Sequence, residues 1–193
     1  MIALNRLASH AALPLGQKGV SIVEIAVTVA VLAALGLIGV PAFQEWIANS
    51  RVRTTSDSIL NGLQLARAEA IRRNRLVEFQ LTGADGGWQV VSAPADANCP
   101  LAAGASADDV LQSRNAQEGA RNVQVVTDPA AQTRVTFSPM GLISTQCIAP
   151  FARLDVSTDA IAAPRALRIV VSTTGGVRMC EPSRPSSDPR ACP

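Results

Sequence analysis

The feature that most constrains this chain is an apolar run near its N-terminus. Residues 25–43 contain no charged side chain, and 18 of the 24 residues from 20 to 43 are apolar. As a helix, the uncharged run is about 28 Å long, close to the roughly 30 Å hydrocarbon thickness of a bilayer. Arg6 and Lys18 precede the run, whereas the charges that follow it cancel. The positive-inside rule therefore predicts a cytoplasmic N-terminus and an exported remainder.

Two simple interpretations of this run are open. It fits a secretory signal peptide that is cut after Ala42, and it fits a plain signal anchor that keeps its helix. Neither accounts for Glu24, a carboxylate at the very start of the run. An ionised acid inside a bilayer costs roughly 3 kcal/mol on insertion scales, so Glu24 is expected to have a partner.

The residues around Glu24 resemble a known family. The string KGVSIVE at residues 18–24 resembles the processing site of type IV prepilins. The resemblance implies that a prepilin peptidase and N-methyltransferase cuts between Gly19 and Val20, methylates the new amino group of Val20 and leaves the apolar helix in place. Glu24 would be the fifth residue of the mature chain. Pro41 matches a proline that bends or loosens the helix in that family.

Electrostatics alone also suggests an assembly role for Glu24. In an assembly of such chains, the positive amino terminus of a neighbour would pair with this carboxylate. That pairing would set the axial register between helices, as one buried polar residue does in a coiled coil. The alternative is that Glu24 lies at the headgroup level or interacts with the positive end of the helix dipole.

Beyond Pro41 the sequence predicts that the helix continues. Apolar residues recur at steps of 7, 4, 3 and 4, an amphipathic period, at Val52, Ile59, Leu63, Ala66 and Ala70. Cations at residues 72 and 73 suit a helix C-terminus. The two halves predict one helix of roughly fifty residues, half in the membrane and half covering a soluble domain.

After residue 74 the pattern changes to that of strands. A hairpin is predicted at residues 76–91, followed by strands at 122–127, 134–137, 151–156, 167–172 and 176–180. Residues 93–119 are interpreted as a long loop with a short helix near 108–112. The expected fold is α+β: a long N-terminal helix packed on an antiparallel domain of five to seven strands in one or two small sheets. The expected segments are a leader (1–19), a membrane half of the helix (20–43), an amphipathic half (44–74) and a β domain (75–193).

The sequence at the end of the predicted helix resembles a narrower branch of the same family. The string ARAEAIRR at residues 66–73, with FSPMG at 137–141 and GVRMCEP at 176–182, resembles the FimT/FimU minor pilins and the H-type pseudopilins of type II secretion. The resemblance extends well over residues 19 to about 90 and moderately over the C-terminal third.

The four cysteines are Cys99, Cys147, Cys180 and Cys192. They include no C-x-x-C pair and have no histidine to join them, which disfavours zinc, and an even count in an exported domain favours two disulfides. Of the three pairings we favour Cys180–Cys192, leaving Cys99–Cys147 to tie the long loop to the sheet. The alternative is that Cys99 stays free.

The C-terminal tail carries candidate nucleic-acid contacts. Some FimT-like proteins bind DNA through a Gly-Arg-x-Arg motif, which residues 175–178 match with Gly176 in place of the first arginine. The candidates are Arg178, Arg184 and Arg190. Phosphate binding depends on several cations acting together, and acids in the same tail offset these arginines, which favours an ordinary solvated surface.

The composition gives little support to catalysis. His10 and Lys18 are the only histidine and lysine, and cutting after Gly19 would remove both. The mature chain would carry fifteen arginines against fifteen acids. This excludes His-based triads and His-rich metal sites, so we predict no catalytic residue, cofactor or metal. The adjacent acids at residues 108 and 109 are interpreted as solvated.

The resemblance implies a structural function: a minor pilin that primes or joins a type IV pilus. The chain is expected to cross the inner membrane once, with a periplasmic C-terminal domain and other pilins as partners. A pseudopilin of type II secretion is the alternative, and a DNA-binding uptake component is the second alternative.

Overall fold

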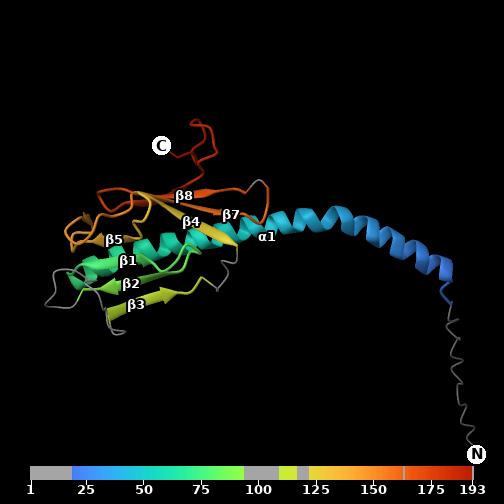
Figure 1. Cartoon of the computed structure of the whole chain (residues 1–193), viewed down its shortest axis with the longest axis horizontal. Helices are drawn as coiled ribbons and strands as arrows, with labels where there is room; N and C mark the ends of the chain where they lie inside the picture. The colour runs from blue at the N-terminus through green and yellow to red at the C-terminus, as the bar shows by residue number, and fades with distance from the viewer. Residues whose placement is uncertain (1–18, 94–108, 117–121, 163, 193) are drawn as a thin grey trace, which may run out of the picture. The chain divides into compact units, whose positions relative to one another are not determined.

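The computed structural model describes residues 19–93, 109–116, 122–162 and 164–192 and divides the chain into two compact units, Met1–Pro41 and Ala42–Pro193. One helix, α1 (Ile22–Arg73), contributes to both (Figure 1). Its residues up to Pro41 belong to the first unit and the remainder to the second. Its 52 residues confirm the predicted long N-terminal helix.

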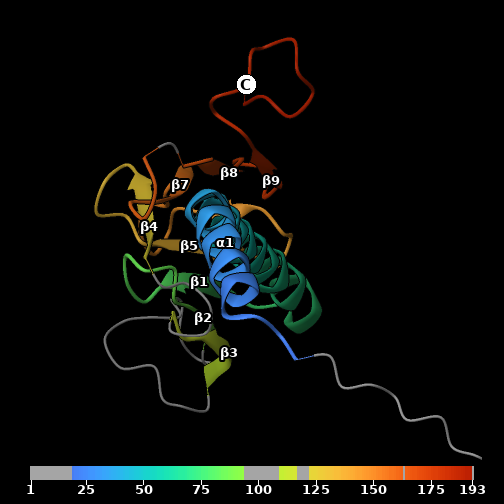
Figure 2. The same cartoon turned by 90° about the vertical axis from the view of Figure 1, so that its right-hand side faces the viewer.

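The second unit contains nine described strands in two antiparallel sheets, which confirms the α+β fold class. The strands are β1 (Val77–Leu81), β2 (Trp88–Ser92), β3 (Val110–Arg114), β4 (Val123–Asp128), β5 (Arg134–Phe137), β6 (Ile143–Ser144), β7 (Arg153–Thr158), β8 (Leu167–Val171) and β9 (Val177–Cys180). The first sheet has the order β3-β2-β1-β5-β6, and the second has the order β4-β7-β8-β9. In Figure 2 both sheets lie beside the part of α1 that belongs to the second unit.

The buried face of α1 is the one that the amphipathic period predicts. The five residues of that period are all 0% exposed and belong to the central core, namely Val52, Ile59, Leu63, Ala66 and Ala70. Side chains from both sheets complete this core. The helix therefore acquires its stability in the second unit from burial of one apolar stripe.

Three aromatic rings connect the two sheets beneath the helix. The ring of Phe79 on β1 lies 5.8 Å from the ring of Trp88 on β2 and 6.5 Å from Phe151, which precedes β7. The indole N–H of Trp88 donates a hydrogen bond of 2.9 Å to the hydroxyl of Ser58 on α1. A Cβ atom at Gly62 would lie only 2.8 Å from the Phe79 ring, so the absent side chain lets the helix approach the rings closely.

The β1–β2 turn also joins the sheets. Gly86 adopts a positive φ of 83° in this turn, a conformation that favours glycine. The carbonyl oxygen of Ala84 accepts a 2.7 Å hydrogen bond from the backbone N–H of Val125, which lies on the edge strand β4 of the second sheet. This bond covers part of an edge that would otherwise be open.

The structure corrects two predictions. Residues 110–114 form strand β3, paired with β2 across a register shift at Val90 and Val91, whereas the sequence predicted a short helix near residues 108–112. The nine described strands also exceed the five to seven expected, because β3 and the two-residue strand β6 were not anticipated. The remainder of the interval 93–119 lies largely outside the described residues.

Candidate assembly surface

The N-terminal end of α1 is an exposed, capped helix start. Gly19 and Val20 lie outside the helix and are exposed. Ser21 is the N-cap: its hydroxyl accepts a hydrogen bond of 3.3 Å from the N–H of Val23, and its carbonyl accepts one of 3.0 Å from the N–H of Glu24. The Ser-x-x-Glu spacing at residues 21–24 is that of a capping box. The bond between Gly19 and Val20 therefore lies in exposed backbone immediately before the helix.

Glu24 lies in the first turn of α1 and is exposed. Within the described residues no ion pair involves its carboxylate. An acid in this position interacts favourably with the positive end of the helix dipole, so the structure is compatible with both interpretations of its role. Its pairing with a neighbouring amino terminus stays a prediction.

The apolar side chains that follow Glu24 are exposed among the described residues of the first unit. This part of α1 is long and apolar enough to cross a membrane, and none of its most apolar window is buried. Ile25 is 53% exposed, Leu32 is 67% exposed and Leu37 is 81% exposed. The surface therefore requires lipid or protein around it, because a patch of this size is costly in water.

Pro41 lies inside α1 and is the last residue of the first unit. A proline at an interior position removes one backbone hydrogen bond and clashes with the carbonyl four residues earlier. The bend or loosening predicted at Pro41 stays a prediction.

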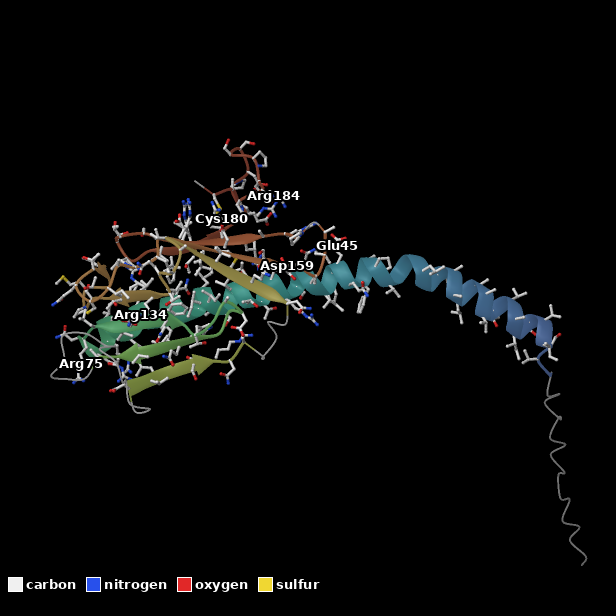
Figure 3. The ribbon with its side chains drawn as sticks, in the orientation of Figure 1. Glu45, Arg75, Arg134, Asp159, Cys180 and Arg184 are labelled. Atoms are coloured by element: carbon white, nitrogen blue, oxygen red, sulfur yellow. A yellow bond between two sulfur atoms is a disulfide. The ribbon has the colours of Figure 1, made fainter. Side chains whose placement is uncertain are left out.

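The C-terminal tail is closed by a disulfide and by ion pairs. Cys180 and Cys192 are joined by an S–S bond of 2.01 Å, which confirms the favoured pairing. Figure 3 shows Cys180 at the end of β9 and Arg184 in the loop that follows. The Nε of Arg184 lies 2.6 Å from the carboxylate of Glu181. Hydrogen bonding from Arg184 lowers the pKa of Glu181, and hydrogen bonding from the backbone N–H of Arg190 lowers the pKa of Asp188.

Two of the three candidate DNA contacts are therefore engaged within the tail. Arg184 pairs with Glu181 and Asp188, and Arg190 lies 3.3 Å from Asp188 and 3.9 Å from Glu181. Arg178 lies on β9 with an exposed side chain. The structure does not bring the three guanidinium groups together as an unpaired cationic cluster.

The other predicted cysteine site is described only in part. Cys147 is disulfide-bonded, whereas Cys99 lies outside the described residues, so the pairing Cys99–Cys147 stays a prediction. Of the two adjacent acids near this segment, Asp108 also lies outside the described residues. Among the residues that are described, no group of three or more His, Cys, Asp or Glu side chains could hold a metal ion.

Sequence reasoning missed two features of the second unit. Phe43 and Trp46 form a stacked, exposed aromatic pair on α1, with ring centroids 5.9 Å apart. The signal was present, because two large aromatic residues three positions apart share a helix face. Glu78 on β1 is a carboxylate that is only 1% exposed, and strand alternation alone gave no reason to expect it to be covered.

Comparisons with known proteins match the chain to one family model. The family model described as type II transport protein GspH matches residues 55–175. Among solved structures, the type IV minor pilin FimU of Pseudomonas aeruginosa strain PAO1 is 17% identical, with a TM-score of 0.49, covering 74% of this chain and 96% of that one. The minor pseudopilin EpsH from the type 2 secretion system of Vibrio cholerae is 15% identical, with a TM-score of 0.46, covering 69% of this chain and 99% of that one. No curated protein matches the chain.

Proposed function

Because the chain belongs to the family of the type II transport protein GspH, we propose that it is a minor subunit of a filament of pilin-like proteins, and specifically a minor pilin that primes or joins a type IV pilus. The observation that carries this proposal is the exposed apolar surface of α1, which follows a single charged residue, Glu24, at the start of the helix. Such a helix is stable in lipid and equally able to pack among identical helices, which suits a subunit that passes from the membrane into a filament.

Processing at Gly19 prepares the subunit for assembly in this proposal. The exposed backbone at Gly19 and Val20 supports cutting there, since a peptidase requires access to an extended bond. The product begins with the N-methylated amino group of Val20, four residues before Glu24. Mass spectrometry of the purified protein is expected to find this methylated terminus, and a Gly19→Val variant is expected to keep residues 1–19. A wild-type chain that starts at Met1, or one that starts after Ala42, would contradict this step.

Glu24 supplies the axial register in the filament. Its carboxylate would pair with the cationic amino terminus of a neighbouring subunit in the low-dielectric interior of the bundle, where an unpaired charge is costly. Glu24→Ala is therefore expected to reach the membrane at the wild-type level but to fall at least about tenfold in sheared filaments, measured by immunoblot.

Glu45→Ala is the matched control for this experiment. Glu45 is also an exposed carboxylate on α1, but it lies in the second unit. We expect this variant to enter filaments normally. Incorporation of Glu24→Ala at the wild-type level would disprove the register role.

A pseudopilin in a type II secretion system is the second candidate. The observation that favours it is the family model, whose description refers to type II transport. Deletion of the gene separates the two functions when twitching motility and protein secretion are assayed in the same strain. Loss of twitching with intact secretion is expected for the pilus function, and the opposite result would establish the pseudopilin.

A DNA-binding uptake component is the third candidate and has the weakest support. Arg184 and Arg190 are paired with acids of the same tail, so few counterions would be released on binding phosphate. We expect the second unit to give no gel shift with duplex DNA even at low salt. A salt-sensitive shift that Arg178→Ala abolishes would reverse this conclusion.

A further inference from the structure

The aromatic pair of α1 lies at the point where the exposed face of the helix changes from apolar to polar. Phe43 is 60% exposed and Trp46 is 65% exposed. At steps of three or four residues the same face continues with polar side chains only, namely Ser50, Arg53, Asp57, Asn61 and Gln64. Towards the N-terminus, the exposed residues of α1 back to Ile25 carry no charge. The pair therefore lies where the exposed surface of α1 changes from apolar to polar residues.

The distance from the helix start to this boundary matches the thickness of a membrane. From Ile22 to Trp46, a rise of 1.5 Å per residue gives about 36 Å. A bilayer is about 30 Å thick in its hydrocarbon core and about 40–45 Å thick with its headgroups. The helix therefore has enough residues to extend from one headgroup layer to the other. Tryptophan favours the headgroup level because its ring is largely apolar while its N–H finds polar partners.

A second element of the same unit lies close to this level. The loop between β7 and β8 is tied to α1 by a hydrogen bond of 3.1 Å from the backbone N–H of Arg165 to the side-chain oxygen of Asn49, one turn beyond Trp46. Figure 3 labels Glu45 on this part of α1 and Asp159 at the start of the loop. Arg165 is exposed, and Glu45 and Arg51 are the other charged groups within about a turn and a half of Trp46. Asp159 begins the same loop, so two cations stand against two acids at this level and the charges cancel. The preference for the headgroup layer therefore rests on the aromatic pair.

We propose that Phe43 and Trp46 form an interfacial anchor that binds the headgroup region of the outer leaflet, and so fixes the depth of the unassembled subunit. The β7–β8 loop then lies against the membrane surface. This inference rests on the proposed membrane insertion of α1 but goes beyond it, because insertion alone requires no contact between Trp46 and lipid. The competing occupant of this aromatic face is a helix of a neighbouring subunit.

The two tryptophans of the chain allow a direct test. Trp46 is exposed, whereas Trp88 is 3% exposed in the core and serves as the internal control. The full-length chain is reconstituted into phosphatidylethanolamine–phosphatidylglycerol vesicles, at a protein-to-lipid ratio too low for copies to meet. Tryptophan emission is then compared in lipids brominated near the headgroup and in lipids brominated near the acyl-chain end. Trp88→Phe reports Trp46 alone, and Trp46→Phe reports Trp88 alone.

We expect headgroup-proximal bromine to quench Trp46 emission about twofold and deep bromine to quench it less, with Trp88 insensitive to both. Where Trp88→Phe fails to fold, the difference between the wild type and Trp46→Phe gives the same quantity. Flotation of the vesicles is measured in parallel. A chain that floats with unquenched Trp46, or with Trp46 quenched most by deep bromine, overturns the anchor while leaving insertion intact. A chain that does not float overturns the proposed membrane insertion itself.

Discussion

At the scale of single residues, Glu78 is the least expected group in the second unit. Its carboxylate is covered on β1, where the hydroxyl of Thr136 donates a hydrogen bond of 3.3 Å and Arg134 lies 3.4 Å away. Burial nevertheless outweighs both partners and raises the pKa of Glu78. An acid whose pKa is higher in the folded state than in the unfolded state binds its proton more tightly when folded.

This shift predicts a pH dependence of stability. As pH rises from the ordinary pKa of a glutamate towards the raised value, the unfolded chain releases its proton first, so the free energy of unfolding falls. Glu78→Gln removes this decline, so its advantage in unfolding free energy over the wild type should grow as pH rises above the ordinary pKa of a glutamate, measured by urea unfolding over a series of pH values.

Glu69 provides a control because its pKa is shifted in the opposite direction to that of Glu78. Hydrogen bonds from Arg72 and Arg73 lower the pKa of Glu69, so its contribution to stability is present at neutral pH and is lost as pH falls. Glu69→Gln should therefore differ most from the wild type at neutral pH and least in acid. A constant difference between Glu78→Gln and the wild type at every pH would show that the Glu78 pKa is not raised.

Gly62 is the second residue with a definite expectation. Alanine normally stabilises a helix relative to glycine by about 1 kcal/mol. Here the added Cβ would lie 2.8 Å from the Phe79 ring and 3.1 Å from the Trp88 ring, both in the packed core. We expect Gly62→Ala to lower the free energy of unfolding by about 1–2 kcal/mol, measured by urea unfolding. Gln64→Ala on the exposed face should be nearly neutral, and a stabilised Gly62→Ala would show that the rings move aside freely.

At the scale of elements, the disulfide defines the tail that follows β9. Cys180 and Cys192 are 12 residues apart, and a loop of this size restricts the unfolded chain by about 3 kcal/mol in the chain-entropy picture. We expect the double variant Cys180→Ala/Cys192→Ala to lose about 2–3 kcal/mol of unfolding free energy while keeping its far-UV circular dichroism. The ion pairs of Arg184 with Glu181 and of Arg190 with Asp188 should keep part of the tail folded in this variant. Loss of the sheet signal would instead mean that β9 depends on the bond.

The elements also show which parts of the fold the sequence can predict. The helix and seven of the nine strands carry their own periodicity, so local pattern and burial agree. β3 has no such pattern: VLQSR places two apolar residues together and then three polar ones, and all five are half-buried or exposed. Its strand form depends on pairing with β2, a non-local cause that the segment itself does not encode. β6 is too short to carry a period.

The candidate assembly surface also combines features that are encoded locally with features that depend on distant contacts. The processing motif, Glu24 and the apolar run are contiguous in sequence and are therefore visible there. The ion pairs that engage Arg184 and Arg190 depend on how the tail folds back, and the burial of Glu78 depends on tertiary cover. These features could not be predicted from the sequence because each depends on contacts between distant segments and not on the residue types alone.

At the scale of the whole molecule, the two units differ in whether they have a hydrophobic core of their own. Among the described residues, the hydrophobic core and the side chains packed against it lie between Val52 and Met179, within the second unit. The most apolar window of α1 has none of its described residues buried. A chain that begins at Ala42 is therefore expected to fold cooperatively without detergent. Thermal unfolding followed by circular dichroism tests this, with the full-length chain in detergent as the control. A truncated chain without a cooperative transition would show that the first unit contributes to folding.

The buried face of α1 also determines how the second unit bears mechanical force. Between Val52 and Ala70 the helix is in contact with a single core that both sheets share, over about 27 Å of its length. Tension applied through the N-terminal end of α1 loads this whole contact in shear, so many side-chain contacts must give way together. The helix therefore passes such a load to both sheets along its whole buried face rather than at a single residue.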